Sequence, residues 1–183
     1  MADAGADLAG EARFVDAMAP RTARILDAGC GPGRVGAELA GRGHDVVGVD
    51  VDPELIAAAE ADHPGPTWIV GDLAELDLAA HGIAERFDVI VCCGNVMPFL
   101  APSTRRDVLT RLGAHLDPGG RIAVGFGSGR DYDFAEYRDD VERAGLIIDL
   151  EFATWDLRPM TTDAEFMVSI LRKAYPEVPD YVT

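Results

Sequence analysis

The sequence predicts an α/β protein: a doubly wound, mostly parallel sheet of seven strands with helices on both faces and an antiparallel C-terminal hairpin. Three observations lead to this prediction. Short apolar runs alternate with amphipathic segments through five strand–helix units. The fourth run, residues 87–93, is almost continuously apolar, as a parallel strand covered on both faces requires. A glycine-rich turn follows the first strand, where sheets of this kind bind their ligands.

Helices are expected where apolar residues recur at helical spacing between breaking residues. Pro20 ends the first helix, and Pro53 opens the third at its first turn, where a missing N–H costs nothing. Ser103 is the expected N-cap of the fourth helix, and Gly145 ends the fifth. The expected helices cover residues 8–18, 35–42, 53–59, 103–115 and 133–144.

Strands are expected in the aliphatic runs between these helices. A turn at residues 117–120, Asp-Pro-Gly-Gly, leads into the fifth strand, and the last two strands form a hairpin. Residues 73–82 are predicted to form a loop or a short helix. The expected strands cover residues 24–27, 44–50, 67–70, 87–93, 121–126, 146–154 and 165–172.

We expect residues 1–183 to form a single domain, since neither a repeat nor a linker is visible. Residues 1–20 would form an N-terminal helix and a candidate lid over the site. Residues 24–126 would form the ligand-binding core, and residues 131–175 the C-terminal helix and hairpin.

Composition excludes several classes of protein. The net charge of −16 disfavours nucleic acid, whose phosphates need a basic surface. No apolar stretch approaches the roughly 20 residues of a membrane span, and the N-terminus has no early basic residue. Three cysteines, two of them adjacent, suit neither a disulfide framework nor a metal site, and the four histidines lie at no ligand spacing. We therefore expect a cytoplasmic protein without a metal, a membrane contact or a nucleic-acid partner.

Polar residues follow four of the expected strands. Asp27, Asp50 and Asp72 stand at the ends of the first three, and Gly94 and Asn95 follow the fourth. The carboxyl ends of parallel strands meet at one edge of a sheet, so these residues should share one crevice. Three carboxylates would repel a pyrophosphate. They suit a phosphate-free nucleoside with a positive centre.

From about residue 24 to residue 173 the chain resembles the class I S-adenosylmethionine-dependent methyltransferases, which have a Rossmann-like sheet. Residues 25–33, Ile-Leu-Asp-Ala-Gly-Cys-Gly-Pro-Gly, are similar to the first motif of that family. Further similar segments are residues 50–51, 71–73, 87–95, 116–121 and 144–146. Each likeness alone is weak, but six in the right order and spacing are specific.

The resemblance implies a role for each matching residue. Asp50 would hold both ribose hydroxyls, Val51 would pack on the adenine, and Asp72 would accept from its amino group. The exit of the fourth strand would lie near the methionine end. The residues expected to bind S-adenosylmethionine are Asp27, Gly29, Cys30, Gly31, Gly33, Asp50, Val51, Asp72, Leu73, Gly94 and Asn95.

Structural roles are open alternatives for the same residues. The three glycines could only form a tight turn, and Asp27 could also bond to backbone amides in that turn. Asp50 could cap the helix at Pro53, although Asp52 fills that role more naturally, and Asp72 could cap a loop. The cysteines could be buried fillers. Met97, Phe99 and Tyr132 are candidate substrate contacts and, with Trp155, equally candidate core residues.

The implied function is methyl transfer to an O, N, S or C nucleophile of a small molecule, mainly by alignment and desolvation. No catalytic base can be named. The segment after the fourth strand, residues 94–99, lacks the Asn/Asp-Pro-Pro-aromatic signature of amino-group methylation on nucleic acid or protein, and an acid for a catechol-type magnesium site is not evident. Without an inserted cap, the substrate would be enclosed by residues 1–20, by residues 130–134 or by a second subunit, so we expect a monomer or a homodimer.

Two other functions fit parts of the sequence. Gly31, Gly33 and Gly36 satisfy Gly-x-Gly-x-x-Gly with Asp50 19 residues past Gly31, as in an NAD(P)-binding oxidoreductase. That alternative lacks a Tyr-x-x-x-Lys motif and leaves Asp72 unexplained. A non-catalytic protein that binds S-adenosylmethionine or S-adenosylhomocysteine is the other, because the sequence shows no evident catalytic base.

Overall fold

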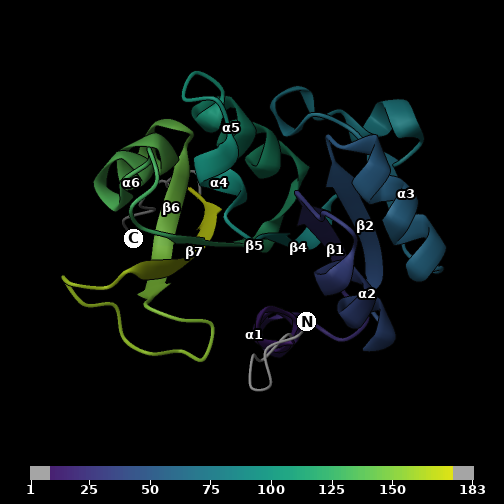
Figure 1. Cartoon of the computed structure of the whole chain (residues 1–183), viewed down its shortest axis with the longest axis horizontal. Coiled ribbons are helices and arrows are strands. Elements are labelled where there is room, and N and C mark those ends of the chain that lie inside the picture. Colours follow the sequence, from purple (N-terminus) through teal and green to yellow (C-terminus); the bar gives the residue numbers. More distant parts are fainter. Residues whose placement is uncertain (1–8, 175–183) are drawn as a thin grey trace, which may run out of the picture.

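The structure, a computed structural model, describes residues 9–174, and the predicted features of residues 1–8 and 175–183 lie outside this range. Seven strands form one sheet in the order β3-β2-β1-β4-β5-β7-β6 (Figure 1). The strands are β1 (Arg24–Ala28), β2 (Asp45–Asp50), β3 (Thr67–Val70), β4 (Phe87–Cys92), β5 (Leu116–Gly127), β6 (Leu146–Phe152) and β7 (Phe166–Lys173).

The pairing confirms the predicted doubly wound sheet. The first five strands pair in parallel, and β7 is antiparallel to both of its neighbours, β5 and β6. The strand order reverses between β1 and β4, because β1 pairs with β2 on one side and with β4 on the other. The carboxyl ends of these strands therefore form the crevice in which such sheets bind ligands.

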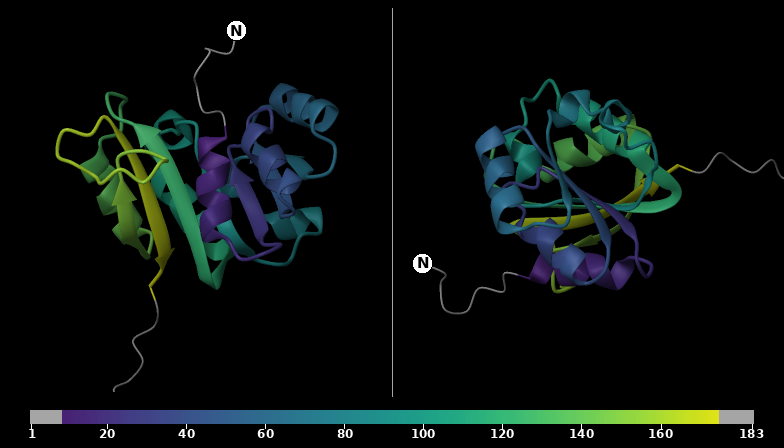
Figure 2. Two further views of the ribbon diagram at one scale, coloured as in Figure 1. Left: turned by 90° about the horizontal axis from the view of Figure 1, so that it is seen from below. Right: turned by 90° about the vertical axis from the view of Figure 1, so that its right-hand side faces the viewer.

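Helices cover both faces of the sheet, as expected (Figures 1 and 2). On one face α1 and α2 pack on β1, β4 and β5, and α3 lies beside α2 through a cluster around Trp68. On the other face α4, α5 and α6 pack with two 3₁₀ turns, η1 and η2. The helical elements are α1 (Gly10–Met18), α2 (Arg34–Gly41), α3 (Pro53–Asp62), η1 (Leu73–Glu75), η2 (Leu78–His81), α4 (Val96–Phe99), α5 (Arg105–His115) and α6 (Phe134–Arg143).

Alternate residues of the central strands enter opposite cores. In β1, Ile25 packs among the residues of α1 and α2, whereas Leu26 packs on the side of α5. In β5, Ala123 and Val124 divide in the same way. Burial on both faces is why these strands have no polar alternation in the sequence.

Three local predictions were wrong or incomplete. The turn expected at residues 117–120 lies within β5, which begins at Leu116 because Leu116 already pairs with Phe87. The next pair joins Val89 to Arg121, so the intervening residues of β5 form an irregular bulge. The N-cap position of α5 is Thr104 rather than Ser103, and the Thr104 hydroxyl donates to the Ala101 carbonyl instead of capping the helix. The short helix α4 was not predicted.

Among residues 9–174, no helix has both the length and the apolar character needed to cross a membrane. Within the same residues, no group of three histidine, cysteine or acidic side chains could hold a metal ion.

Candidate functional site

A cavity of about 520 Å³ opens at the carboxyl ends of β1 to β4. Its polar side chains are Asp50, Asp72 and Thr104, and the described residues that line it include no lysine, arginine or histidine. The lining residues are Gly29, Gly31, Asp50, Val51, Leu55, Gly71, Asp72, Leu73, Gly94, Val96, Phe99, Leu100, Ala101 and Thr104.

The glycine turn after β1 forms the floor of this cavity. Gly29 and Gly31 line it and adopt left-handed backbone conformations, with φ of 78° and 54°. A Cβ on Gly29 would lie 2.4 Å from a methyl carbon of Val96, whereas a Cβ on Gly31 would meet no atom within 4 Å. Gly29 therefore allows the start of α4 to approach the turn, and Gly31 leaves open space above its backbone.

Gly33 and Cys30 belong to the same turn but face the neighbouring helices. Gly33, with φ of 84°, occupies the N-cap position of α2, and a Cβ there would crowd Trp68 and Ala59. Cys30 is buried with Ile56, Ala59 and Trp68, and burial raises the pKa of its thiol well above the usual value. Neither residue lines the cavity, so the structure gives both of them a packing role.

Asp50 lies at the end of β2 and connects the cavity to the turn. Its Oδ2 accepts a hydrogen bond from the Gly31 N–H at 2.8 Å, and its Oδ1 accepts from the Asp52 N–H at 3.0 Å. Asp52, not Asp50, caps α3 by accepting from the Glu54 N–H at 2.8 Å. Each carboxylate oxygen of Asp50 accepts one of these backbone bonds and retains a second lone pair, and Asp50 lines the cavity.

Asp27 is buried near the end of β1, directly before the glycine turn. It is 1% exposed, and its Oδ2 accepts from the Gly36 N–H at 2.8 Å, within the first turn of α2. Burial raises the pKa of the Asp27 carboxyl to about 7, against the hydrogen bond from Gly36, which lowers it. Asp27 does not line the cavity. Its carboxyl occupies the helix N-terminus to which a dinucleotide enzyme would bind pyrophosphate.

The end of β3 contributes the opposite wall. Asp72 caps η1 by accepting from the Ala74 N–H at 2.8 Å through Oδ1, so the alternative capping role is present. Asp72 also lines the cavity, together with Leu73 and the exposed side chain of Val51. The capping and lining roles are compatible, because the cap uses only Oδ1 of the Asp72 carboxyl.

The exit of β4 brings two predicted residues to different places. Gly94 lines the cavity with φ of 72°, and a Cβ there would meet no atom within 4 Å. Asn95, also left-handed with φ of 64°, accepts a hydrogen bond from the Gly127 N–H at 2.8 Å through Oδ1. Asn95 thus ties the exits of β4 and β5 together and is absent from the cavity lining.

Of the three predicted substrate contacts, the structure places only Phe99 at the cavity. Phe99 is 72% exposed. Met97 and Tyr132 are each 1% exposed and belong to the core. Tyr132 stacks on Phe126 with ring centroids 5.7 Å apart and donates its hydroxyl hydrogen to Asp140. The candidate core role is therefore the one that the structure gives to Met97 and Tyr132.

Residues after Asn95 that the sequence analysis did not single out also line the cavity: Val96, Leu100, Ala101 and Thr104. They come from α4 and from the segment that precedes α5. No chemical signal marks these side chains in the sequence. The indicator would have been position, because they directly follow a strand end at the edge where the winding reverses.

The described part of N-terminal residues 1–20 does not cover the cavity. Helix α1 buries Ala12 and Val15 against the sheet, and Glu11 forms a bidentate ion pair with Arg34 of α2. Residues 9–20 line none of the cavity described above. The rest of the candidate lid, residues 1–8, lies outside the described residues.

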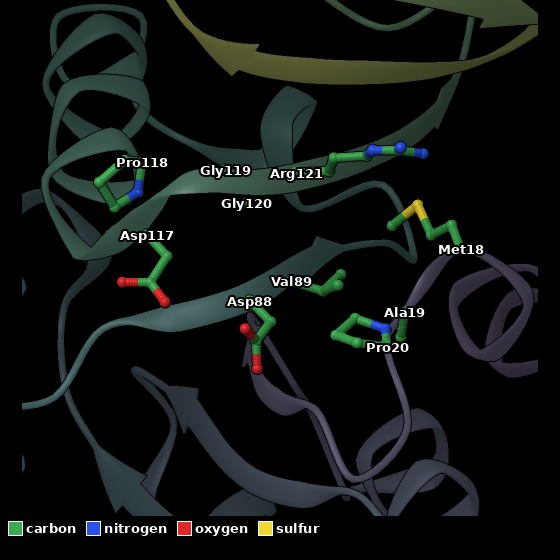
Figure 3. Close-up of a pocket in the computed structure, with 10 residues that line it drawn as sticks. All are labelled: Met18, Ala19, Pro20, Asp88, Val89, Asp117, Pro118, Gly119, Gly120 and Arg121. Atoms are coloured by element: carbon green, nitrogen blue, oxygen red, sulfur yellow. The ribbon is translucent and has the colours of Figure 1, made fainter.

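A second cavity, of about 560 Å³, opens at the opposite edge of the sheet, where β4 and β5 begin (Figure 3). Its carboxylates are Asp88, which accepts from the Arg24 N–H at 2.8 Å, and Asp117. Arg121 points away from them, toward Met18 (Figure 3). This cavity lies at the amino ends of the strands, whereas sheets of this kind bind their ligands at the carboxyl ends, so we assign no ligand to it.

The donor set of the first cavity fits S-adenosylmethionine. At Gly31 and Gly94 the backbone borders open space, which a side chain at either position would fill. The carboxylates of Asp50 and Asp72 lie at the ends of β2 and β3. Within the described part of the chain, no cationic residue lines the cavity. A positively charged sulfonium bound there would therefore meet no repulsion from the lining residues.

Comparison with known proteins agrees with this geometry. The sequence profile of the family described as "Methyltransferase domain" matches residues 25–120, more than half of the chain. A TehB-like SAM-dependent methyltransferase from Corynebacterium glutamicum has a solved structure with 46% sequence identity and a TM-score of 0.88. That comparison covers 94% of this chain and 92% of the other.

Two further proteins are more distant or shorter matches. A magnesium-protoporphyrin O-methyltransferase from Rhodobacter capsulatus is 40% identical over 95 residues, which are 49% of this chain and 39% of that protein. The chain therefore matches less than half of the length of that relative. The structure of a magnesium protoporphyrin IX methyltransferase from Synechocystis, with bound SAM, has a TM-score of 0.67 at 20% identity, covers 89% of this chain and 76% of the other, and supports the fold.

The fold and the cavity define a class I S-adenosylmethionine-dependent methyltransferase. The chain belongs to the methyltransferase domain family, whose cofactor is S-adenosylmethionine. This membership decides against the NAD(P)-binding alternative, as does the occupation of the α2 N-terminus by Asp27.

Proposed function

We propose that this protein transfers the methyl group of S-adenosylmethionine to an O, N, S or C nucleophile of a small molecule, mainly by alignment and desolvation. The observation that carries the proposal is the cavity at the carboxyl ends of β1 to β4. It combines a glycine floor, two carboxylates and an otherwise apolar lining in which no described residue is cationic.

Within this proposal, Asp50 binds the ribose hydroxyls through the lone pairs that Gly31 and Asp52 leave unused. Val51 and Leu73 pack on the adenine, and Asp72 accepts from its amino group. The glycine turn and Gly94 allow the methionine portion to approach the backbone closely. Asp27, Gly33, Cys30 and Asn95 act indirectly, by holding the turn and the strand exits in place.

The proposed chemistry needs little from the side chains. The cofactor supplies an electrophilic methyl group on a positively charged sulfur. The described cavity lining contains no histidine, tyrosine, lysine or glutamate. We therefore propose that the acceptor atom arrives with a free lone pair, and that the chain contributes orientation and a dry surface. Proximity of this kind contributes roughly 7 to 11 kcal/mol in the best model reactions.

Several properties support a small acceptor. The net charge of −16 opposes binding of nucleic acid. The R. capsulatus relative is named for O-methylation of magnesium-protoporphyrin, which is a small molecule. We further propose a single domain, because the seven strands form one sheet. We propose a cytoplasmic location, because all three cysteines are free and buried. The protein is proposed to be a monomer or a homodimer.

The first experiment is a calorimetric titration of the purified protein with S-adenosylmethionine, S-adenosylhomocysteine and NAD, each alone. We expect micromolar binding of the first two and no heat from NAD. Binding of NAD, or the absence of binding heat with all three ligands, would contradict the assignment of the cavity.

Catalysis is then separated from binding alone. The protein is incubated with S-adenosylmethionine and a panel of small O, N, S and C acceptors, and release of S-adenosylhomocysteine is followed. A non-catalytic binder would bind both ligands and release none above the rate without protein. We expect release that depends on the acceptor and is lost in a variant that cannot bind the cofactor.

A further inference from the structure

Arg105 is an unusual residue for the interior of this protein. It is the first residue of α5 and only 2% exposed, and it is among the largest fully buried side chains. Arginine is almost never fully buried unless its charge is paired. A cation is also disfavoured at a helix N-terminus, where the helix dipole is positive. A favourable interaction with the dipole of α5 therefore does not explain why arginine stands at this position.

The contacts of Arg105 lie in the segment between β5 and α6 and in the first turn of α6. Its Nη2 donates to the Asp131 carbonyl at 2.6 Å, and its Nη1 forms an ion pair with Glu136 at 3.2 Å. Its guanidinium carbon lies 4.1 Å from the ring centroid of Tyr132. The Nε is buried without a hydrogen-bond partner among the described residues, so two N–H groups and one ring face determine how the guanidinium lies.

This segment reaches the rim of the cavity through Arg130. The guanidinium carbon of Arg130 lies 4.9 Å from the ring centroid of Phe99, which lines the cavity and is otherwise largely exposed. Arg130 directly precedes Asp131, whose carbonyl Arg105 holds. One buried cation thus fixes the backbone that places a second, exposed cation over the aromatic residue at the rim.

We infer that Arg105 is a positioning residue: it holds residues 130–132 so that Arg130 closes on Phe99 as a latch at the rim of the cofactor cavity. This inference rests on the proposed function, because it takes the cavity as the S-adenosylmethionine site. The latch slows the escape of the bound ligand. Arg105 acts on the ligand only through Arg130, since neither Arg105 nor Tyr132 lines the cavity.

The rate of dissociation of S-adenosylhomocysteine tests the latch without a known acceptor. The ligand is bound to the full chain and displaced by excess S-adenosylmethionine in a stopped-flow instrument. Arg130→Ala should raise the dissociation rate roughly two- to fivefold, the range of an exposed cation–π contact. Arg105→Met should raise it by a similar factor. The double variant should be no faster than either single variant.

Arg106→Ala is the matched control, because Arg106 is the next residue of α5 and is exposed. It should leave the dissociation rate unchanged. If Arg105→Met is too unstable to purify, Arg105→Lys replaces it. Lysine keeps the positive charge but has one donor nitrogen in place of the planar guanidinium, so it cannot contact Asp131 and Glu136 in the same way. It should give an intermediate rate, and hydrogen exchange of residues 128–132 should rise in the same order as the rates.

The outcomes separate the inference from the proposed function. If the wild-type protein does not bind S-adenosylhomocysteine, the proposed function fails. If it binds but Arg130→Ala does not change the dissociation rate, the latch is absent. If Arg105→Met changes the rate equally in the presence and absence of Arg130, Arg105 is only a structural core residue and the positioning role is overturned.

Discussion

Asp50 and Asp52 are two residues apart, yet the structure gives them separate roles. Asp50 accepts the backbone N–H groups of Gly31 and Asp52, whereas Asp52 accepts from Glu54 and caps α3. Asp50→Ala should weaken binding of S-adenosylmethionine by roughly 1.5 to 3 kcal/mol, the value of hydrogen bonds to a charged group. Isothermal titration measures the change.

Asp52→Ala is the control for that variant. It removes a helix cap and should lower the free energy of unfolding by about 1 kcal/mol while the affinity is retained. If Asp50→Ala folded normally and bound the cofactor as tightly as the wild type, Asp50 would not be the ribose ligand.

Gly48 packs closely against the indole ring of Trp68. A Cβ on Gly48 would lie 2.3 Å from the indole ring and 3.0 Å from the Cys30 sulfur. Gly48→Ala should therefore destabilise the protein by roughly 1 to 3 kcal/mol through overpacking. Gly41, at the end of α2, has no atom within 4 Å of such a Cβ. Gly41→Ala should be neutral or slightly stabilising, and equal urea midpoints for the two variants would contradict this account.

At the scale of elements, the buried Asp27 joins β1 to α2 through the Gly36 N–H. Its folded pKa, about 7, is raised above the ordinary value of 3.8, mainly by burial. A raised pKa gives a stability contribution that is complete below about pH 3.8 and is lost as the pH rises through about 7. Asp27→Asn keeps the acceptor oxygen and cannot ionise.

We therefore expect wild-type protein to lose stability relative to Asp27→Asn between about pH 4 and pH 7, by an amount on the order of a few kcal/mol. Urea unfolding at pH 5, 6, 7 and 8 measures the difference between the two proteins. Parallel stability curves across this range would show that Asp27 does not titrate in the folded state.

The elements also show what a single sequence can predict. The five parallel strands and the C-terminal hairpin were predicted because each strand is an apolar run between turn residues, which is a local signal. The bulge in β5 was missed because pairing of Leu116 with Phe87 depends on a distant strand. Helix α4 was missed because four residues that include Pro98 carry no helical periodicity.

The candidate site also contains residues that local sequence signals predict and residues that they do not. Asp50, Asp72 and Gly94 were placed at the cavity by their positions after strands, which the topology brings together. Met97 and Tyr132 were not separable from core residues, because an apolar or aromatic side chain can pack equally well in a core or a pocket. The tie between Asn95 and Gly127 joins two strand exits, and no local pattern reports it.

At the scale of the whole molecule, the net charge of −16 should influence which ligand arrives fastest. S-adenosylmethionine carries a net positive charge near neutral pH, because its sulfonium adds to a zwitterionic amino acid, whereas S-adenosylhomocysteine is neutral. A negative field attracts the first and not the second. Salt shortens the reach of that field from about 30 Å at 0.01 M to about 8 Å at 0.15 M.

We expect the association rate of S-adenosylmethionine to fall severalfold between these two salt concentrations, while that of S-adenosylhomocysteine changes little. Stopped-flow association with each ligand at 0.01 and 0.15 M NaCl measures both slopes on the same protein. Each ligand serves as the control for the other, since they differ by one methyl group and one charge. Equal slopes would show that the acidic surface does not steer the cofactor, and that its charge has a role apart from ligand capture.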